Sequence, residues 1–420
     1  MGIKGLMKFL QDTAPRAVKE RASPEAYTGR VIAIDASMCL YQFLIMIREG
    51  SSGSFANLSN KEGQVTSHLV GFLARTIRLM ESGIKPVYVF DGAPPELKLG
   101  ELEARRARRE RAGEALEAAR EGGEAEDVLR STKMTVRVTP EQTEQTKRLL
   151  RLMGVPVIEA PSEAEATCAG LCKAGKVYAS ATEDLDCLTF GTRVLIRNLF
   201  AVESQKKTIY EVTLAAALEQ LGLSMEQFVD FCILCGCDYC DSLKGIGPKT
   251  AIGLIQRYGR LEGILAGLAS DPQSKVAVPP EFLQRAQAAR DFFLECETAS
   301  PDSAALDWGQ PDFENLRKFL VEESSFNEDR VARFLDRLRT ARGRTTQQPL
   351  DKFFAPRPRP GLGASGRLSA EAERAAAPKP ELPLAAASGR KQKRREAEVS
   401  PQCSASAKKK TGTAGKRQKC

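Results

Sequence analysis

Short apolar runs alternate with longer mixed segments along the first 200 residues of the chain. Each run is rich in β-branched or aromatic residues, and the segments between the runs are of helix length. The runs are VIAI at 31–34, VYVF at 87–90, VPVI at 155–158, VYASA at 177–181 and VLI at 194–196. This alternation is typical of a parallel sheet with crossover helices. We therefore predict an α/β fold with a mostly parallel central sheet flanked by helices.

Three other segments depart from this alternation. Residues 98–130 are rich in Glu, Arg and Ala without a continuous apolar stripe, and glycines at 113, 122 and 123 interrupt them, which predicts a solvated helical insertion. Residues 213–305 are predicted to be mainly helical, because apolar residues recur there near the helical period. From residue 355 onward Pro, Ala, Ser, Lys and Arg dominate, which predicts a disordered tail.

Length and charge limit what the core can do. The 420 residues suffice for one large core with insertions or for two average domains. The net charge is +8, but residues 355–420 hold 16 Lys and Arg against 5 Asp and Glu, so residues 1–354 carry a net −3. The core must therefore bind any nucleic acid through local positive patches, and some of its acids serve another purpose.

The N-terminus predicts neither export nor lipid attachment. MGIKGLMKFL lacks the sustained apolar stretch of a secretory signal, so we expect the 11 cysteines to be reduced inside the cell. Leu6 stands where a myristoylation motif needs Ser or Thr. No apolar run approaches the roughly 18 residues that a spanning helix needs, so we expect no membrane association.

Carboxylates follow four of the predicted strands. Because the carboxyl ends of parallel strands share one edge of the sheet, these acids are expected to converge. A further aspartate lies in CGCDYC. The seven candidates are Asp35, Asp91, Glu163, Glu165, Asp184, Asp186 and Asp238.

Carboxylates held this close repel one another unless divalent cations lie between them. Hard oxygen ligands favour magnesium or manganese over zinc. The single histidine, His68, excludes a histidine general base elsewhere. Two metal ions about 4 Å apart can bind a phosphodiester and activate water for its hydrolysis without a side-chain nucleophile.

Structural roles are also open for some of these acids. Ser162 and Glu165 form the S-x-x-E pattern of a capping box, which is compatible with metal binding. Asp35 and Asp91, taken singly, fit ordinary turn residues.

Two segments carry the features of DNA binding. GIGPK at 245–249 resembles a helix-hairpin-helix turn that holds a phosphate, or else a glycine cap before a proline-started helix. A cationic cluster downstream of Asp91 would attract a phosphate to the acids, or would form a solvated helix face. The cluster consists of Lys98, Arg105, Arg106, Arg108, Arg109 and Arg111. Tyr41 and Arg48 fit base stacking and phosphate binding, although Tyr41 fits core packing equally.

The linker and tail carry docking signals. QQPLDKFF at 347–354 places Leu350, Phe353 and Phe354 in polar surroundings, which indicates a partner that buries them or a fold-back onto the core. GRKQKRR and AKKK…GKRQK are similar to nuclear-import signals. Four closely spaced cysteines at 232, 235, 237 and 240 lack the spacing of a zinc ribbon and are predicted to be buried.

Taken together, these motifs resemble the eukaryotic flap endonuclease family of structure-specific 5′ nucleases over nearly the whole chain. MGIKGL, IAIDASMCLYQFL, KPVYVFDGAPPELK, APSEAEA, ATEDLDCLTFG, GCDYC and GIGPK occur in the family's order and spacing. The resemblance implies a PIN-like core with a helical arch, 5′ flap cleavage with 5′ to 3′ exonuclease activity, and roles in Okazaki-fragment maturation and long-patch base excision repair.

The same resemblance assigns residues. It implies that the seven acids bind two Mg²⁺ ions, for which Mn²⁺ can substitute, and that Lys98 and Arg105 engage the scissile phosphate. It implies a K⁺ ion at the hairpin, and docking of a monomer on the trimeric clamp, proliferating cell nuclear antigen, through Gln347, Leu350, Phe353 and Phe354. The implied DNA contacts are Tyr41, Arg48, Arg75, Glu163, Gly236, Asp238, Gly245, Gly247 and Lys249.

The resemblance also divides the chain and places it in the cell. It implies a nuclear protein, in nucleoplasm and nucleolus, and leaves a mitochondrial form open. The expected regions are an N-terminal nuclease region at 1–109, a helical arch at 110–126, an internal nuclease region with the hairpin at 127–258, a C-terminal helical part at 259–340, a clamp-binding peptide at 346–354 and a disordered basic tail at 355–420.

Some positions depart from the family pattern. Ala104 and Met134 stand at usually basic positions, Cys237 replaces a small hydroxyl residue, and residues 51–61 form an unusual loop. These departures leave two alternatives: a catalytically weak protein that binds DNA junctions and the clamp, or a sister nuclease that prefers gaps, bubbles or duplex ends.

Overall fold

A computed structural model describes residues 2–48, 66–122, 125–200, 207–272, 276–300 and 306–343. The chain divides into a compact unit, Met1–Pro356, and a second unit, Arg357–Cys420. All described residues belong to the first unit. The predicted clamp-binding peptide at 346–354 and the predicted basic tail at 355–420 lie outside the described residues. In the described ranges, no helix combines the length and the apolar character that crossing a membrane requires.

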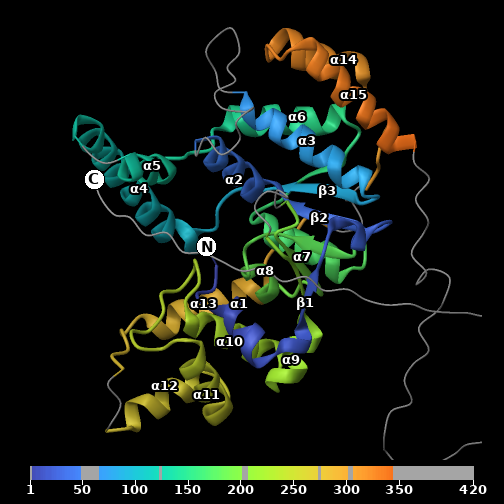
Figure 1. Cartoon of the computed structure of the whole chain (residues 1–420). Helices are drawn as coiled ribbons and strands as arrows, with labels where there is room; N and C mark the ends of the chain where they lie inside the picture. Colours follow the sequence, from blue (N-terminus) through green and yellow to red (C-terminus); the bar gives the residue numbers. More distant parts are fainter. Residues whose placement is uncertain are drawn as a thin grey trace, which may run out of the picture. The chain divides into compact units, whose positions relative to one another are not determined.

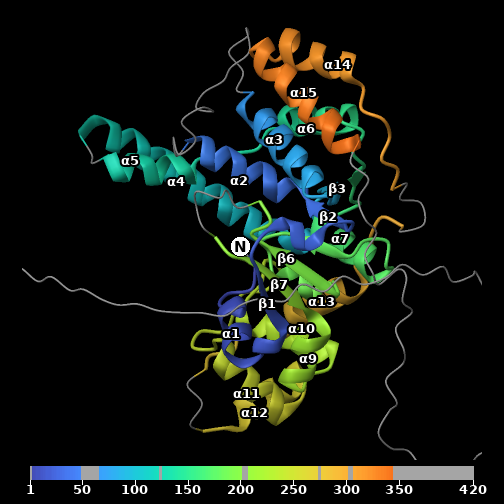
Figure 2. The ribbon, with the colours of Figure 1, turned by 45° about the vertical axis from the view of Figure 1, so that its right-hand side comes forward.

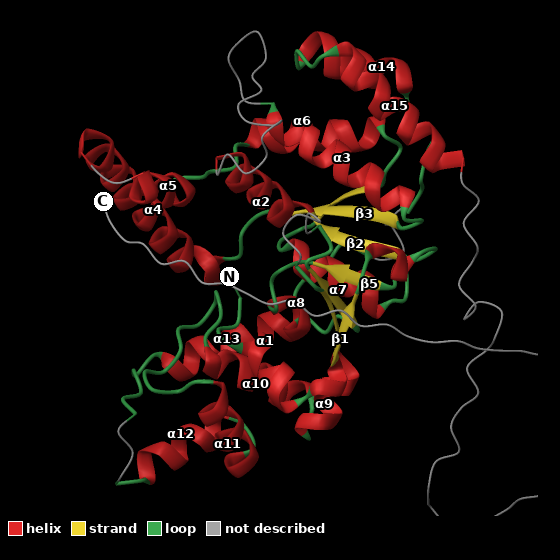
Figure 3. Cartoon of the chain, in the orientation of Figure 1, coloured by secondary structure: helices red, strands yellow, loops and turns green. Residues whose placement is uncertain are grey.

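One seven-stranded sheet lies within the compact unit, with the strand order β1-β7-β6-β5-β2-β3-β4 (Figure 3). The strands are β1 (Val18–Arg21), β2 (Val31–Asp35), β3 (Lys85–Phe90), β4 (Val157–Glu159), β5 (Ala179–Ala181), β6 (Val194–Arg197) and β7 (Ile209–Thr213). Five neighbouring strands of the sheet run parallel: β6, β5, β2, β3 and β4. β7 is antiparallel to both β6 and β1. The predicted mostly parallel α/β fold is therefore confirmed.

Helices cover both faces of the sheet because successive residues of its inner strands point to opposite sides. In β2, Ile32 and Ile34 belong to one hydrophobic core and Ala33 to another. On the first face lie α2 (Ala36–Arg48), α3 (Ser67–Glu81) and α6 (Pro140–Leu152), and on the second lies α7 (Ala164–Lys173) (Figure 1). α15 (Glu328–Gly343) packs against α3 and contributes to the core of the first face. Short elements complete the unit: Pro15–Ala17, Pro24–Tyr27, Glu96–Lys98, α8 (Asp186–Thr189), α14 (Phe313–Lys318) and a π-helix at Phe319–Glu323.

A further hydrophobic core lies among the helices that follow β7. Buried phenylalanines 9, 228 and 231 belong to it, and α1 joins helices more than 200 residues later in the chain. The helices are α1 (Leu6–Thr13), α9 (Leu214–Leu221), α10 (Met225–Cys235), α11 (Pro248–Tyr258), α12 (Leu261–Ser270) and α13 (Phe282–Glu295). The prediction of a mainly helical segment at 213–305 is confirmed for its described residues.

The predicted helical insertion forms two helices that pack against each other, α4 (Leu99–Gly122) and α5 (Ala125–Met134). Both views show this pair, which we call the arch, projecting from the rest of the compact unit (Figures 1 and 2). The expected interruption at Gly113 is wrong, because α4 continues through it. A Cβ atom on Gly113 would meet nothing within 4 Å, so Gly113 lies on an open surface of the helix. The helix therefore loses only the free energy by which glycine is a weaker helix former than alanine.

Candidate active site

The parallel strands bring the candidate acids to one pocket. Asp35 is the last residue of β2, Asp91 directly follows β3, and Glu163 and Glu165 lie at the start of α7 after β4. β5 leads to Asp184 and Asp186. Six of the seven acids line a single pocket: Asp35, Asp91, Glu163, Glu165, Asp184 and Asp238. The seventh, Asp186, donates its backbone N–H to Asp184 Oδ1 over 3.0 Å.

Local hydrogen bonds fix the orientation of two of these carboxylates. Asp35 accepts from the backbone N–H of Met38 at 2.9 Å and from the hydroxyl of Thr182 at 3.0 Å. Asp91 Oδ1 accepts from the backbone N–H of Ala164 at 2.9 Å. Asp35 and Asp91 therefore each satisfy an amide at the start of a helix, as capping residues do, while lining the pocket.

The capping box proposed for Ser162 and Glu165 is wrong. Glu163, not Ser162, directly precedes α7, and the Glu163 side chain makes no capping hydrogen bond to the start of the helix. The buried Ser162 hydroxyl has no hydrogen-bond partner. Asp91, from the end of β3, instead binds the amide of Ala164 at the start of the helix.

Burial and mutual repulsion disfavour the charged forms of several acids. Burial, followed by the charge on Asp91, raises the pKa of Asp35 to about 7. Burial also raises the pKa of Glu165 well above its usual range, and the charges on Asp35 and Asp91 add to the shift. The pKa of Asp186 is likewise raised by burial and by Asp184. The pocket thus concentrates negative charge that needs compensation from outside the acid set.

The donor set fits a hard divalent cation. Oxygen atoms of Asp91, Glu163 and Glu165 lie within 4.8 Å of one another. The buried Oδ1 atom of Asp186 has no hydrogen-bond partner, and so is open to a further ligand. Carboxylate oxygens without thiolate or imidazole suit magnesium, calcium or manganese. Within the described ranges, none of the four closely spaced cysteines joins a possible metal-binding group, and Cys232, Cys235 and Cys240 are buried in the helical core.

Two cations at the base of the arch contact the acids. Lys98 Nζ lies 2.6 Å from Glu163 and 3.9 Å from Asp238, and Arg105 donates to Asp238 over 2.5 Å. Burial alone would lower the pKa of Lys98, but the charges on Glu163 and Glu165 outweigh it and the pKa is raised. Lys98 therefore remains protonated next to the acids.

The other cations of the predicted cluster face in different directions. Arg108 and Arg109 line the acidic pocket. Arg106, by contrast, pairs with Glu110 of its own helix and has a side chain that is 77% exposed, as expected for a solvated helix face. Arg111 is also exposed and donates to the carbonyl of Ala107. Both interpretations of the cluster therefore apply, each to a different side of α4.

Residues predicted to contact DNA have different surroundings. Tyr41 is half-buried and lines the pocket. The guanidinium of Arg75 lies 3.9 Å from the ring centroid of Phe43, and burial lowers the pKa of Arg75 to about 10. Arg48 ends α2, but its side chain lies outside the described part.

Several pocket residues escaped the sequence analysis. Thr182 holds Asp35 and also accepts from the backbone N–H of Asp184 at 3.1 Å, and only its place in ATEDLD hinted at this role. The sequence gives no signal for the apolar part of the lining, because its members lie in and beyond the arch and are far apart in sequence. They include Leu102, Val136 and Val138.

The predicted hairpin joins α10 to α11. Gly236, at φ +96°, ends α10, and Gly245 has φ +86°, so both adopt backbone conformations that favour glycine. Gly247 precedes α11, and Pro248 is its first residue. The glycine cap with a proline start is therefore present, and it is compatible with a phosphate-binding hairpin. Lys249 follows within the first turn.

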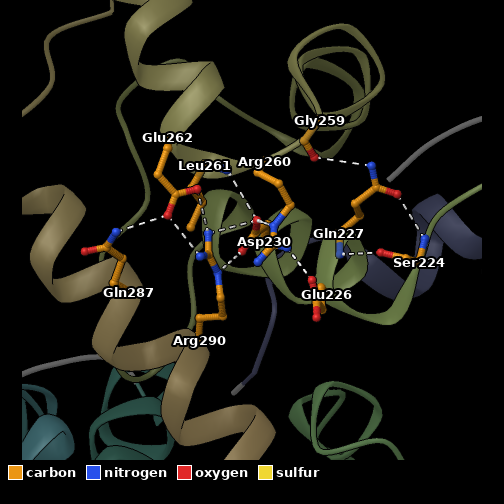
Figure 4. A network of polar contacts seen from close by, with 10 residues as sticks. All are labelled: Ser224, Glu226, Gln227, Asp230, Gly259, Arg260, Leu261, Glu262, Gln287 and Arg290. Carbon is orange, nitrogen blue, oxygen red and sulfur yellow. Dashed lines mark hydrogen bonds and ion pairs between the residues drawn. The ribbon is translucent and has the colours of Figure 1, made fainter.

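An ionic network centred on one buried aspartate joins the helices near this hairpin (Figure 4). Asp230 on α10 is fully buried and accepts from Arg260 at 2.9 Å and from Arg290 at 2.5 and 2.9 Å. Arg290 on α13 also donates to Glu262 on α12 at 3.0 Å. The network therefore ties α10, α12 and α13 into one support for the hairpin.

Comparisons with known proteins agree with this architecture. Residues 1–112 match the XPG N-terminal domain, and residues 154–238 match the XPG I-region. The solved flap endonuclease-1 from Methanococcus jannaschii superimposes with a TM-score of 0.60 at 32% identity, covering 81% of this chain and 98% of that one. The fold, with acids at one edge of its sheet, thus defines a nuclease of this architecture.

Sequence relatives narrow the class to a family. Flap endonuclease 1 from Homo sapiens is 50% identical over 354 residues, which are 84% of this chain and 90% of the relative. Flap endonuclease 1 from Plasmodium knowlesi is 48% identical over an alignment of 366 residues that covers 84% of this chain. The chain belongs to the flap endonuclease family. It spans 60%, 55% and 53% of the lengths of three Plasmodium relatives.

Proposed function

We propose that the protein is a structure-specific 5′ flap endonuclease with accompanying 5′ to 3′ exonuclease activity on DNA. The observation that carries the proposal is the acidic pocket at the carboxyl edge of the sheet, with Lys98 and Arg105 of the arch base in contact with its acids. Paired positive and negative groups in one pocket suit a phosphodiester and the cations that neutralise it. Membership of the flap endonuclease family supports flapped DNA as the substrate.

Magnesium is the proposed cofactor, with manganese as a substitute. Asp91, Glu163 and Glu165 would hold one ion, and Asp184 and Asp186 would contribute to a second, with Asp35 and Asp238 adding charge. Bound magnesium would supply Lewis-acid activation of water and stabilisation of the leaving oxygen. The all-carboxylate donor set and the unpaired Oδ1 atom of Asp186 support this assignment.

The chain's own residues would orient the substrate. Lys98 and Arg105 would exchange their carboxylate partners for the scissile phosphate, since both already point into the pocket. Tyr41 would stack on an unpaired base beside that phosphate. The glycine hairpin at 245–249, with K⁺, would hold the duplex by its backbone without reading sequence.

We propose that the flaps arise in Okazaki-fragment maturation and in long-patch base excision repair. QQPLDKFF would dock a monomeric enzyme on the trimeric sliding clamp, proliferating cell nuclear antigen, and the basic tail would direct the protein to the nucleus. Replacement of Phe353 and Phe354 by Ala should abolish clamp stimulation while leaving clamp-free cleavage unchanged. Clamp stimulation of the double variant would contradict the docking proposal.

Cleavage of a labelled 5′ flap oligonucleotide with Mg²⁺ tests the nuclease proposal directly. We expect cutting near the flap junction that stops when EDTA is added. Tight flap binding with negligible turnover would instead identify a junction-binding protein. Faster cutting of gaps, bubbles or duplex ends than of flaps would identify a sister nuclease.

A further inference from the structure

The backbone of Gly2 lies directly against the side chains of Asp184 and Asp186. Gly2 has φ +74°, in the left-handed region that favours glycine. A Cβ atom at this position would overlap Asp184 Oδ1 and would lie 3.1 Å from Asp186 Oδ1. Gly2 thus lies against the carboxylates of Asp184 and Asp186, although it is about 180 residues away from them in sequence.

The two oxygen atoms next to Gly2 differ in their hydrogen bonding. Asp184 Oδ1 accepts from the backbone N–H of Asp186 at 3.0 Å. Asp186 Oδ1 is buried and has no hydrogen-bond partner. A buried carboxylate oxygen without a partner loses its hydration and gains nothing in exchange, so a ligand is expected at this atom. Asp184 Oδ1 occupies the place that a side chain at position 2 would take.

We propose that Gly2 is a positioning residue, whose lack of a side chain keeps Asp184 and Asp186 in the arrangement that binds the second metal ion. The inference rests on the proposed metal-dependent nuclease function. Any side chain at position 2 would displace Asp184, because a Cβ atom there would lie only 2.0 Å from Asp184 Oδ1, which is far inside van der Waals contact. The displaced carboxylate would then no longer share a cation with Asp186.

Gly5 provides a matched control. Its φ is +73°, so alanine there suffers the same backbone strain as alanine at position 2. A Cβ atom on Gly5 would lie 3.4 Å from Pro248, an ordinary van der Waals contact. The variants Gly2→Ala and Gly5→Ala therefore differ in whether the new methyl group reaches the acids.

The proposal is tested by titrating the full-length proteins with Mn²⁺ and measuring free Mn²⁺ by electron paramagnetic resonance. Wild type and Gly5→Ala should bind two ions. Gly2→Ala should bind one of them at least tenfold more weakly, with flap binding in EDTA within twofold of wild type. Two sites of unchanged affinity in Gly2→Ala would overturn the proposal. Two Mn²⁺ sites in a wild type that cuts no flap would refute the nuclease function and leave this inference standing.

A double-mutant cycle on stability keeps the proposal testable if Gly2→Ala folds poorly. In EDTA, Gly2→Ala should lower the melting temperature more than Gly5→Ala does. In an Asp184→Ala background the overlapping carboxylate is gone, and Gly2→Ala should then cost no more than Gly5→Ala. An equal loss from Gly2→Ala in both backgrounds would show that the methyl group does not act through Asp184.

Discussion

Arg105 on the arch donates a 2.5 Å hydrogen bond to Asp238, which lies 133 residues further along the chain. The bond places an arch cation on one of the acids that line the proposed metal site. Asp238 and Arg105 thus compensate each other's charge, with Lys98 3.9 Å from Asp238. A metal ion bound at the acids would replace Arg105 as the partner of Asp238, and a bound phosphate would replace Asp238 as the partner of Arg105. Ligand binding at the acids and movement of the arch base would therefore be electrostatically coupled.

Arg105→Ala should slow flap cleavage under single-turnover conditions by about 10²- to 10³-fold, the loss typical of removing one preorganised donor from a reacting oxyanion. Arg317→Ala is a suitable control, because Arg317 pairs with Glu328 on the surface. The control should cut at the wild-type rate. A comparable slowing in both variants would point to a general loss of charge.

Asp184→Ala should reduce cleavage by more than about 100-fold, since even weakening the support of a metal ligand costs 10- to 100-fold. Flap affinity measured in EDTA should stay within about threefold, because the phosphate contacts lie elsewhere. Asp336→Ala, at a surface aspartate that is 79% exposed, should leave the rate unchanged. Normal cutting by Asp184→Ala would refute the proposed metal site.

Asp186→Asn should stabilise the metal-free protein while abolishing cleavage. Burial and the charge on Asp184 raise the pKa of Asp186, so its charged form opposes folding. A neutral side chain of the same shape removes this penalty, and we expect a gain of about 1–2 kcal/mol in the free energy of unfolding. Urea unfolding in EDTA at pH 8 measures it. Unchanged or lower stability would contradict the view that the acids repel one another in the absence of metal.

The stability of the metal-free protein should fall as pH rises from about 4 to about 7. Burial and Asp91 raise the pKa of Asp35 to about 7 in the folded protein, above the usual value of 3.8. The folded state therefore holds the Asp35 proton more tightly, and deprotonation costs up to ~1.4 kcal/mol of unfolding free energy per pH unit.

Thermal unfolding in EDTA at several pH values measures this dependence. Mg²⁺ should reduce it, because metal ligands bind in their deprotonated form and metal affinity rises with pH. Asp35→Asn is the control, and its unfolding should depend less on pH over the same window. An identical pH dependence in the variant would exclude Asp35 as the titrating group.

Asp230→Ala should lower the free energy of unfolding by about 3–5 kcal/mol, because it leaves Arg260 and Arg290 without their buried partner. It should also weaken duplex binding, since the network supports the helices around the hairpin. Glu226→Gln removes an exposed partner of the same Arg260 and should cost less than about 1 kcal/mol. Equal losses of unfolding free energy in the two variants would mean that the burial of Asp230 does not strengthen its contribution to stability.

The inner strands β2 and β3 were predictable because most of their residues are buried and each contains a continuous apolar run. β1, with the sequence VKER, was missed because it is a largely exposed edge strand with no apolar alternation. β7 was missed for another reason: the buried Glu211 interrupts its apolar pattern. Glu211 is stabilised there by Arg21 of β1, a pairing that only the assembled sheet reveals.

The candidate site was predictable to a similar extent. Convergence of the acids followed from strand direction alone, since the carboxyl ends of parallel strands share an edge. The pairing of Lys98 with Glu163, and the position of Gly2 next to Asp184, were not predictable from sequence. Both depend on how segments between the strands pack, which strand periodicity does not determine.

The pairing of β1 with β7 also constrains how the chain can assemble on the ribosome. Arg21 precedes Glu211, its partner, by 190 residues. At synthesis rates of about 5–20 residues per second, β1 waits roughly 10 to 40 s for a neighbour. The parallel strands β2 and β3 can associate earlier, so we expect the β1 edge to close late in folding, after β7 has been made.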